Sequence, residues 1–298
     1  MIHQDTAVNP RLLLVNGAQG GRVADRWADP NGDPWPELEL RLQQAEVTPA
    51  QVQAAWIKLT LLRGGDFPDK AQALQSYLQE IVHILHERYP NLQLVYLSSR
   101  TRSFAYWRGI SPEPVAFETG FAVKWLIEQQ LAGDPALNFD PERGVVTAPY
   151  LAWGPYLWID GENVRADGRI WVQADMTQDC THPSASRNQQ VAEMLYQFFT
   201  TDSTAVSWFL AEHEAATPTA TLAAPTMTAE TAVVTATTGP QTTPLAPTAT
   251  TVSAITATPT PAAPPTATET SSTINLLLII IIGAGLAIGT LWLLRRQV

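Results

Sequence analysis

A long stretch near the C-terminus limits which part of the chain can fold. Residues 215–273 consist largely of Thr, Ala and Pro, with almost no charge and no aromatic side chain. Such a composition cannot bury enough apolar surface to offset the entropy lost on folding. Frequent Pro and β-branched Thr favour an extended, semi-rigid chain. We therefore expect a disordered stalk over residues 214–273, either bare or O-glycosylated, and a folded domain over residues 1–213.

The stalk leads into an uncharged apolar run, Leu276 to Leu294, which is followed at once by Arg295 and Arg296. About 19 residues at ~1.5 Å each span ~28 Å, which matches the hydrocarbon core of a bilayer. Trp292 stands near one end, where interfacial aromatic residues gather. The pattern predicts one C-terminal transmembrane helix within residues 274–294, with residues 276–294 in the lipid bilayer.

The distribution of basic residues predicts the orientation of this span. No Lys or Arg occurs between Arg187 and Arg295. The positive-inside rule therefore makes residues 295–298 a short cytoplasmic tail and puts the large domain outside the cytoplasm. The chain is then a single-pass membrane protein with an extracytoplasmic domain. The alternative is a tail-anchored protein that faces the cytosol.

Within residues 1–213, strand-like apolar runs alternate with amphipathic helical patterns. This alternation predicts an α/β fold with a mostly parallel sheet and helices on both faces. Sites in such sheets gather at the carboxyl ends of the strands, where Gly17–Gly21, Thr60 and Ser98–Ser99 are expected. The strands are expected within residues 11–21, 52–62 and 91–99, and the helices within residues 69–89, 116–133 and the segment after His182.

Charge and cysteine content exclude several classes of function. A net charge of −10 and a pI near 4.9 argue against nucleic-acid binding, which needs clustered Lys and Arg. The single cysteine, Cys180, cannot form an intrachain disulfide. The His residues are scattered, and His83 and His86 lie three apart on an expected helix without an evident third ligand. We expect no metal site and no cofactor, and we interpret the two histidines as part of a helix face.

One short motif carries chemistry. In "DCTHPS", Asp179 and His182 lie three residues apart on a loop that Pro183 ends, with Ser184 or Ser186 available to cap the next helix. In this arrangement His182 can act as a general base while Asp179 fixes its tautomer. The alternative is an ordinary surface loop with an acidic residue before a helix.

An Asp-x-x-His pair near the end of an α/β domain, followed by an amphipathic helix, resembles the last motif block of the SGNH (GDSL-type) hydrolases, which are serine esterases and lipases. The segment "VNGAQGG" after the first strand is similar to the second block of that family. The resemblance implies a flavodoxin-like three-layer α/β/α fold with Asp179 and His182 as catalytic residues. It also implies an oxyanion-hole amide at Gly20, with Gly21 as the alternative one position on.

The chain departs from the family pattern in two places. The third block offers an Asn after the next strand, but "AAWIKLTLLRGG" has none, and Lys58 or Thr60 would have to replace it. The first block carries the nucleophilic serine after the first strand, whereas the first serine here is Ser76, within an expected helix. We therefore expect the sheet to lack its first strand, and the nucleophile is unknown.

The missing block coincides with the absence of an export signal in "MIHQDTAVNPRLLLVNG". A sequence that starts inside a longer protein explains both features at once. A degenerate family member is the alternative.

Other residues are weaker candidates for the site. Ser98 and Ser99 end a strand and are more typical of local hydrogen-bonding caps. Cys180 is too close to His182 in the sequence to be its attacking partner. The aromatic segment "APYLAWGPYLWIDG" can line a sugar-binding groove, although packing of strand aromatics is the simpler interpretation.

Two functions are consistent with these features. The first is a membrane-anchored serine esterase that acts on acylated polysaccharides or lipids and is inactive as this chain because the nucleophile block is missing. The second is a non-catalytic surface module that holds a glycan on a hydrolase-like fold.

Overall fold

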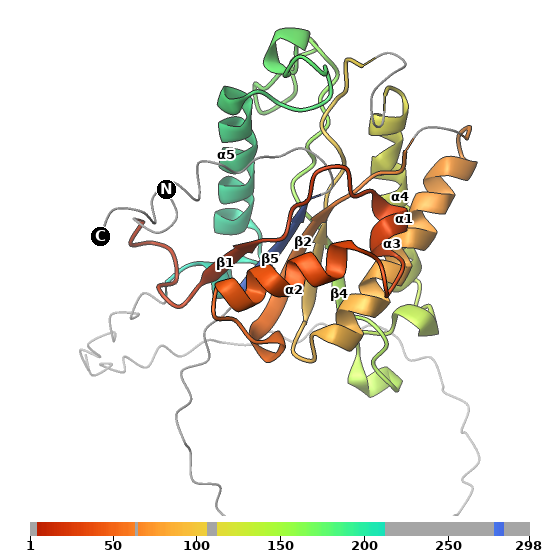
Figure 1. Ribbon diagram of the computed structural model, residues 1–298, viewed down its shortest axis with the longest axis vertical. Coiled ribbons are helices and arrows are strands. Elements are labelled where there is room, and N and C mark those ends of the chain that lie inside the picture. Colours follow the sequence, from red (N-terminus) through yellow and green to blue (C-terminus); the bar gives the residue numbers. More distant parts are fainter. Residues whose placement is uncertain (1–4, 63–64, 106–111, 212–276, 283–298) are drawn as a thin grey trace, which may run out of the picture. The chain divides into compact units, whose positions relative to one another are not determined.

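The computed structural model describes residues 5–62, 65–105, 112–211 and 277–282, and for the last of these ranges the backbone alone (Figure 1). The stalk and most of the predicted membrane span, residues 283–294, lie outside the described residues, as does the predicted cytoplasmic tail.

A parallel sheet forms the centre of the folded domain. Its five strands lie in the order β1-β5-β2-β3-β4, and every neighbouring pair is parallel. Figure 1 shows β5 between β1 and β2. The strands span Leu13–Asn16 (β1), Val52–Lys58 (β2), Leu94–Leu97 (β3), Tyr150–Trp153 (β4) and Leu277–Ile282 (β5).

Helices connect the strands. The α-helices span Ala24–Trp27 (α1), Pro34–Gln44 (α2), Asp69–Arg88 (α3), Val115–Leu131 (α4), Ala185–Thr201 (α5) and Val206–Phe209 (α6). Short 3₁₀ helices cover Pro49–Gln51, Pro135–Leu137, Pro141–Arg143 and Gln173–Asp175. The predicted α/β alternation is confirmed. β1, β2, α3, β3 and α5 lie within the ranges expected from the sequence, and α4 begins one residue before its expected range.

The sheet buries a separate apolar cluster on each face. On one face, Ala55 and Ile57 of β2 pack in a cluster that also holds residues of α1, α2, α3 and α4. On the other, Ala54 and Trp56 pack in a cluster that holds residues of α5 and α6. This division follows from the alternation of side chains along a strand. Because both faces are covered, the polar ends of the strands are left as the place for a site.

β5 differs from the sequence expectation. Its residues fall within the predicted transmembrane helix over 274–294, yet they pair in parallel with both β1 and β2, for example Ile279 with Val15 and with Ala55. A Leu/Ile run suits either a buried strand or an apolar helix, because β-branched Ile favours strands and periodicity does not separate the two. No helix within the described residues has the length and apolar content needed to cross a membrane. The membrane span therefore stays a prediction.

Candidate active site

The residues Asp179 and His182 contact each other directly. The Nδ1 atom of His182 hydrogen-bonds to Oδ2 of Asp179. The other carboxylate oxygen, Oδ1, accepts hydrogen bonds from the backbone N–H of His182 at 2.9 Å, the backbone N–H of Thr181 at 2.9 Å and the hydroxyl of Thr177 at 2.7 Å. The carboxylate is thus held in one orientation by its own loop and directs one oxygen at the imidazole.

This environment keeps the Asp179 carboxylate ionised. Partial burial raises the pKa of Asp179, but the hydrogen bonds from the His182 and Thr181 backbones, the Thr177 hydroxyl and the imidazole outweigh it and hold that pKa well below its usual range. An ionised carboxylate only accepts hydrogen bonds, so Nδ1 of a neutral His182 carries the proton. The Nε2 atom then presents a lone pair, and it is buried without a hydrogen-bond partner among the described residues. A lone pair so placed is what a general base requires.

The loop that carries the pair is fixed at both ends. Met176 and Pro183 form an antiparallel bridge, and within it Thr177 N–H donates to the His182 carbonyl at 2.7 Å. Below the bridge, the Asp175 carboxylate accepts from Arg187 Nε of α5 at 2.6 Å. The loop is therefore tied to the first turn of α5, which limits the movement of the imidazole.

The loop lies at the carboxyl edge of the sheet. The carbonyl of Cys180 accepts a hydrogen bond at 2.7 Å from the backbone of Phe104, in the segment that leaves the carboxyl end of β3. Arg100, in the same segment, interacts electrostatically with Asp179. Sequence analysis did not single out Arg100, although a basic residue directly after a strand-ending Ser-Ser pair was the available signal. This edge is where parallel sheets place their sites.

The glycine bend after β1 divides into two positions with different requirements. Gly21 has a φ of +73°, a conformation that side chains disfavour. Gly20 does not, and a Cβ built on it meets nothing within 4 Å. The backbone conformation therefore favours glycine at 21, whereas position 20 has room for a side chain. Both the bend and the Asp179–His182 pair follow strand ends, but no hydrogen bond joins them within the described residues.

This difference predicts that the same substitution changes the unfolding free energy at one glycine and not at the other. Gly21→Ala is expected to cost about 1–2 kcal/mol of unfolding free energy because of its left-handed backbone. Gly20→Ala is expected to stay within about 0.5 kcal/mol of the parent, since its Cβ points into open space. Urea titrations of the two variants measure both effects. Equal losses would show that the bend needs glycine at both positions for folding.

The serines at the end of β3 are structural. Ser98 and Ser99 are both buried. The Ser98 hydroxyl accepts from Trp56 Nε1 at 2.8 Å, and the Ser99 hydroxyl accepts from the backbone N–H of Leu157 at 3.1 Å. This agrees with their interpretation as hydrogen-bonding caps. Neither contacts His182 Nε2, which has no described partner.

The two replacements considered for the third-block Asn differ in their surroundings. The hydroxyl of Thr60 donates to the Leu61 carbonyl at 3.2 Å, and the Thr60 carbonyl accepts from Ala24 N–H at 2.8 Å. Thr60 therefore serves the backbone around it. Lys58 ends β2 and is buried, with 1% of its surface exposed.

The remaining polar candidates have local roles. Cys180 has a φ of +58° and sits at the tip of the loop. On α3, His83 Nε2 contacts the carbonyl of Ala136 at 2.8 Å. Within the described part of the chain, no three His, Cys, Asp or Glu side chains gather in a way that could hold a metal ion.

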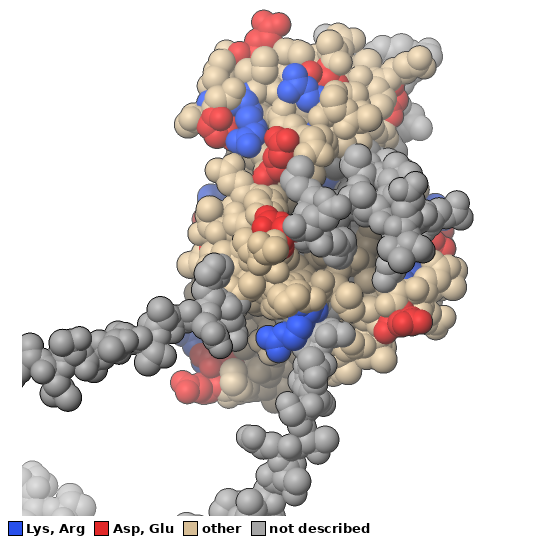
Figure 2. All heavy atoms as spheres, turned by 90° about the vertical axis from the view of Figure 1, so that its left-hand side faces the viewer, with Lys and Arg blue, Asp and Glu red and all other residues tan. Residues whose placement is uncertain are grey.

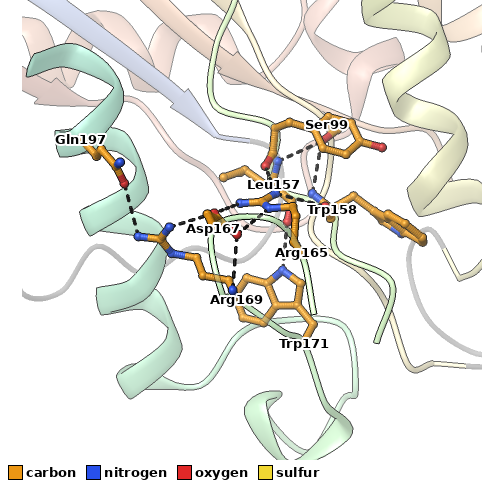
Figure 3. A network of polar contacts seen from close by, with 9 residues as sticks. Ser99, Leu157, Trp158, Arg165, Asp167, Arg169, Trp171 and Gln197 are labelled. Carbon is orange, nitrogen blue, oxygen red and sulfur yellow. Dashed lines mark hydrogen bonds and ion pairs between the residues drawn. The ribbon is translucent and has the colours of Figure 1, made fainter. Parts of the chain in front are cut away.

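The aromatic segment after β4 is held by a polar network, drawn in Figure 3. Arg165 pairs with Asp167, which also binds Arg169, and Arg169 reaches Gln197 of α5 at 3.5 Å. Nearer the sheet, Trp171 Nε1 donates to the Leu157 carbonyl at 2.9 Å. The segment is thereby fastened to α5, the helix that also carries the Asp179–His182 loop.

The same segment lines an open hollow of about 390 Å³. Phe117 and Phe121 of α4 form one side, and Trp153 and Tyr156 the other. Lys124, which pairs with Glu128 at 2.7 Å, contributes the charged part of the lining. The packing interpretation of these aromatics is therefore incomplete, because Trp153 and Tyr156 also line this open hollow. On the face shown in Figure 2, the basic side chains of the described residues lie among acidic ones.

Comparison with protein-family models, with curated proteins and with solved structures finds no match to this chain.

Proposed function

We propose that the folded domain is that of an SGNH-type carboxylic ester hydrolase in which Asp179 and His182 are the acid–base pair. The observation that carries this proposal is the Asp179–His182 hydrogen bond together with the buried, unpartnered Nε2 atom at the carboxyl edge of the sheet. In a triad, Nε2 takes the proton of the attacking serine and later returns it to the leaving group, while the carboxylate stabilises the imidazolium. Gly20 would supply a backbone N–H to the oxyanion.

The strand order supports a flavodoxin-like arrangement. In such sheets the order is 2-1-3-4-5, with the first strand in the second position. In the present sheet, β1, β2, β3 and β4 take the places of strands 2, 3, 4 and 5 of that order. β5 takes the place of strand 1. By the family resemblance, the nucleophile follows that first strand. The sequence after β5 reads "GAG" and offers no serine there.

The attacking serine therefore comes from outside the described residues. Ser76 is on α3, where its hydroxyl donates to the Gln72 carbonyl at 3.1 Å, and Ser184 and Ser186 contact each other at 3.1 Å. No described serine is bonded to Nε2 of His182. Because the sequence lacks the family's nucleophile block, we expect residues 1–298 to be inactive as a serine esterase.

The cellular location of the protein is proposed from the sequence. We propose a single-pass membrane protein whose domain stands outside the cytoplasm on the Thr/Pro-rich stalk. Substrates at such a surface are acyl groups of polysaccharides or lipids.

A second candidate function is favoured by the aromatic hollow. Its lining by Phe117, Phe121, Trp153 and Tyr156 suits the apolar face of a sugar ring, and such a site needs no nucleophile. A non-catalytic glycan-binding module is therefore the alternative.

Hydrolysis of p-nitrophenyl acetate, with and without a fluorophosphonate, separates these functions. A form of the protein that supplies the nucleophilic serine is expected to hydrolyse the ester and to be blocked by the phosphonate, whereas residues 1–298 alone are not. A phosphonate-sensitive rate from residues 1–298 would place the nucleophile among their own serines. Glycan binding without ester hydrolysis in any form of the protein would favour the alternative.

A further inference from the structure

A second hollow, of about 420 Å³, adjoins the aromatic one. Hollows of this size hold small ligands, which bind between apolar walls and a few placed polar groups. This hollow offers both kinds of group. Its walls come from the segment after β4, from the loop that follows it and from α5, and they include Pro155, Tyr156, Arg165, Asp167, Arg169, Met194, Gln197 and Phe198.

The lining of this second hollow has a surplus of positive charge. The guanidinium groups of Arg165 and Arg169 share a single carboxylate, that of Asp167 (Figure 3). Arg165 holds this carboxylate with two hydrogen bonds, from Nε to Oδ1 at 3.0 Å and from Nη2 to Oδ2 at 2.6 Å. These bonds hold the pKa of Asp167 well below its usual range, so the carboxylate is ionised. One positive charge of the lining is therefore not balanced, in a protein whose net charge is −10.

The surplus charge belongs to Arg169. Its Nη1 donates to Asp167 at 2.8 Å, but its Nη2 reaches only the amide oxygen of Gln197 at 3.5 Å, the outer limit of a hydrogen bond. All three nitrogens of Arg165 are engaged, since its Nη1 donates to the Tyr156 carbonyl at 2.6 Å. A carboxylate from a ligand would give Arg169 a charge-assisted hydrogen bond, which is shorter and stronger than the bond to a neutral amide. An anion in this hollow is therefore expected at Arg169.

Tyr156 connects the two hollows, because it lines both. Its ring packs over Gly120 of α4, where an added Cβ would lie 3.2 Å from the ring atom Cε2. The centre of the ring lies 6.2 Å from that of Trp153. Because the Tyr156 carbonyl is bonded to Arg165, the aromatic surface of the first hollow is joined to the charged network of the second.

We propose that the two hollows together bind an acidic oligosaccharide, with the carboxylate of one sugar at Arg169 and a neighbouring sugar ring against Tyr156 and Trp153. A sugar ring has apolar C–H faces that suit aromatic side chains, and hydroxyl groups that suit amides and charged groups. A singly charged carboxylate also matches the single surplus charge. The inference rests on the glycan-binding alternative for the sugar and adds its acidic group. It does not depend on the acid–base pair, which lines neither hollow.

The test is isothermal titration calorimetry of the full chain in detergent with trigalacturonate and with the neutral galactotriose of the same linkage. Wild type is expected to bind trigalacturonate at least tenfold more tightly at low ionic strength, because only this ligand carries carboxylates. Arg169→Gln is expected to abolish that preference and to leave the affinity for galactotriose unchanged. Arg143→Gln, the matched control, removes the same charge from a side chain that is 67% exposed and lines neither hollow, and it should retain the preference.

Arg169→Gln is expected to fold, because Arg165 keeps both of its hydrogen bonds to Asp167, and urea unfolding checks this. A second measurement needs no variant. Raising the NaCl concentration should weaken the binding of trigalacturonate to wild type, since salt screens the attraction of the carboxylate to Arg169, and should not change the binding of galactotriose.

Three results would overturn the inference. Equal affinities of wild type for the two ligands would do so and leave the glycan-binding alternative standing. An unchanged preference in Arg169→Gln would place the charge that recognises the acid elsewhere. No binding of either ligand would overturn the inference and the glycan-binding alternative together. Hydrolysis of p-nitrophenyl acetate decides the esterase function separately, so the two can fail independently.

Discussion

Replacing His182 by Ala in a form of the protein that hydrolyses p-nitrophenyl acetate is expected to lower kcat by a factor on the order of 10⁵–10⁶. Asp179 holds Nδ1 of the His182 ring by a hydrogen bond. The other ring nitrogen, Nε2, has no hydrogen-bond partner among the described residues, so its lone pair can accept a proton. Without it, no described residue accepts the proton of the nucleophile. Steady-state kinetics measure the loss, and KM is expected to change little because the imidazole acts mainly in the transition state.

Two further variants define this effect. Asp179→Asn is expected to cost roughly 10⁴-fold, since an amide N–H beside Nδ1 favours the tautomer that protonates Nε2. His83→Ala, on α3 and bonded to the Ala136 carbonyl, is the control and should retain activity. Unchanged turnover in His182→Ala would remove the pair from the mechanism.

Replacing Ile279 by Pro is expected to destabilise the folded domain by about 4 kcal/mol or more. Ile279 lies in the middle of β5 and pairs with Val15 on one side and Ala55 on the other. Proline has no N–H to donate to the ladder and is excluded from central strands. Because β1 and β2 meet only through β5, losing its pairing separates β1 from the rest of the sheet.

Urea unfolding of the full chain in detergent, followed by the fluorescence of its buried tryptophans, measures this effect. Ile255→Pro, in the stretch that already contains many prolines, is the matched control and should not change the midpoint. An unchanged midpoint for Ile279→Pro would show that residues 277–282 do not complete the sheet, and would leave them to the predicted membrane helix.

The sequence predicted the elements whose apolar pattern is regular. In α3, Leu74, Leu78, Ile81 and Leu85 recur at helical spacing and are buried, whereas Tyr77 is 36% exposed. The strand β2 was recognisable as a continuous apolar run, because parallel strands are buried on both sides. α2, which begins with prolines, was not assigned to any element, whereas the segment that contains β4 was interpreted as packed strand aromatics without strand bounds.

The role of residues 277–282 was beyond prediction for a different reason. An apolar run fits a membrane helix and a central strand equally well. The strand is favoured only by the place between β1 and β2 in the sheet, which the sequence does not reveal. The site shows the same limit. The spacing of Asp179 and His182 could suggest a pair, but the burial of Nε2, which has no hydrogen-bond partner among the described residues, depends on tertiary contacts between distant segments.

The ¹⁵N NMR spectrum of the neutral His182 ring tests the acid–base pair most directly, because it reports which nitrogen carries the proton. The hydrogen bond to an ionised Asp179 predicts a proton on Nδ1 and a bare Nε2, with the proton moving to Nε2 in Asp179→Asn. A wild-type ring protonated on Nε2 would contradict it, because no lone pair would then be available to activate a nucleophile.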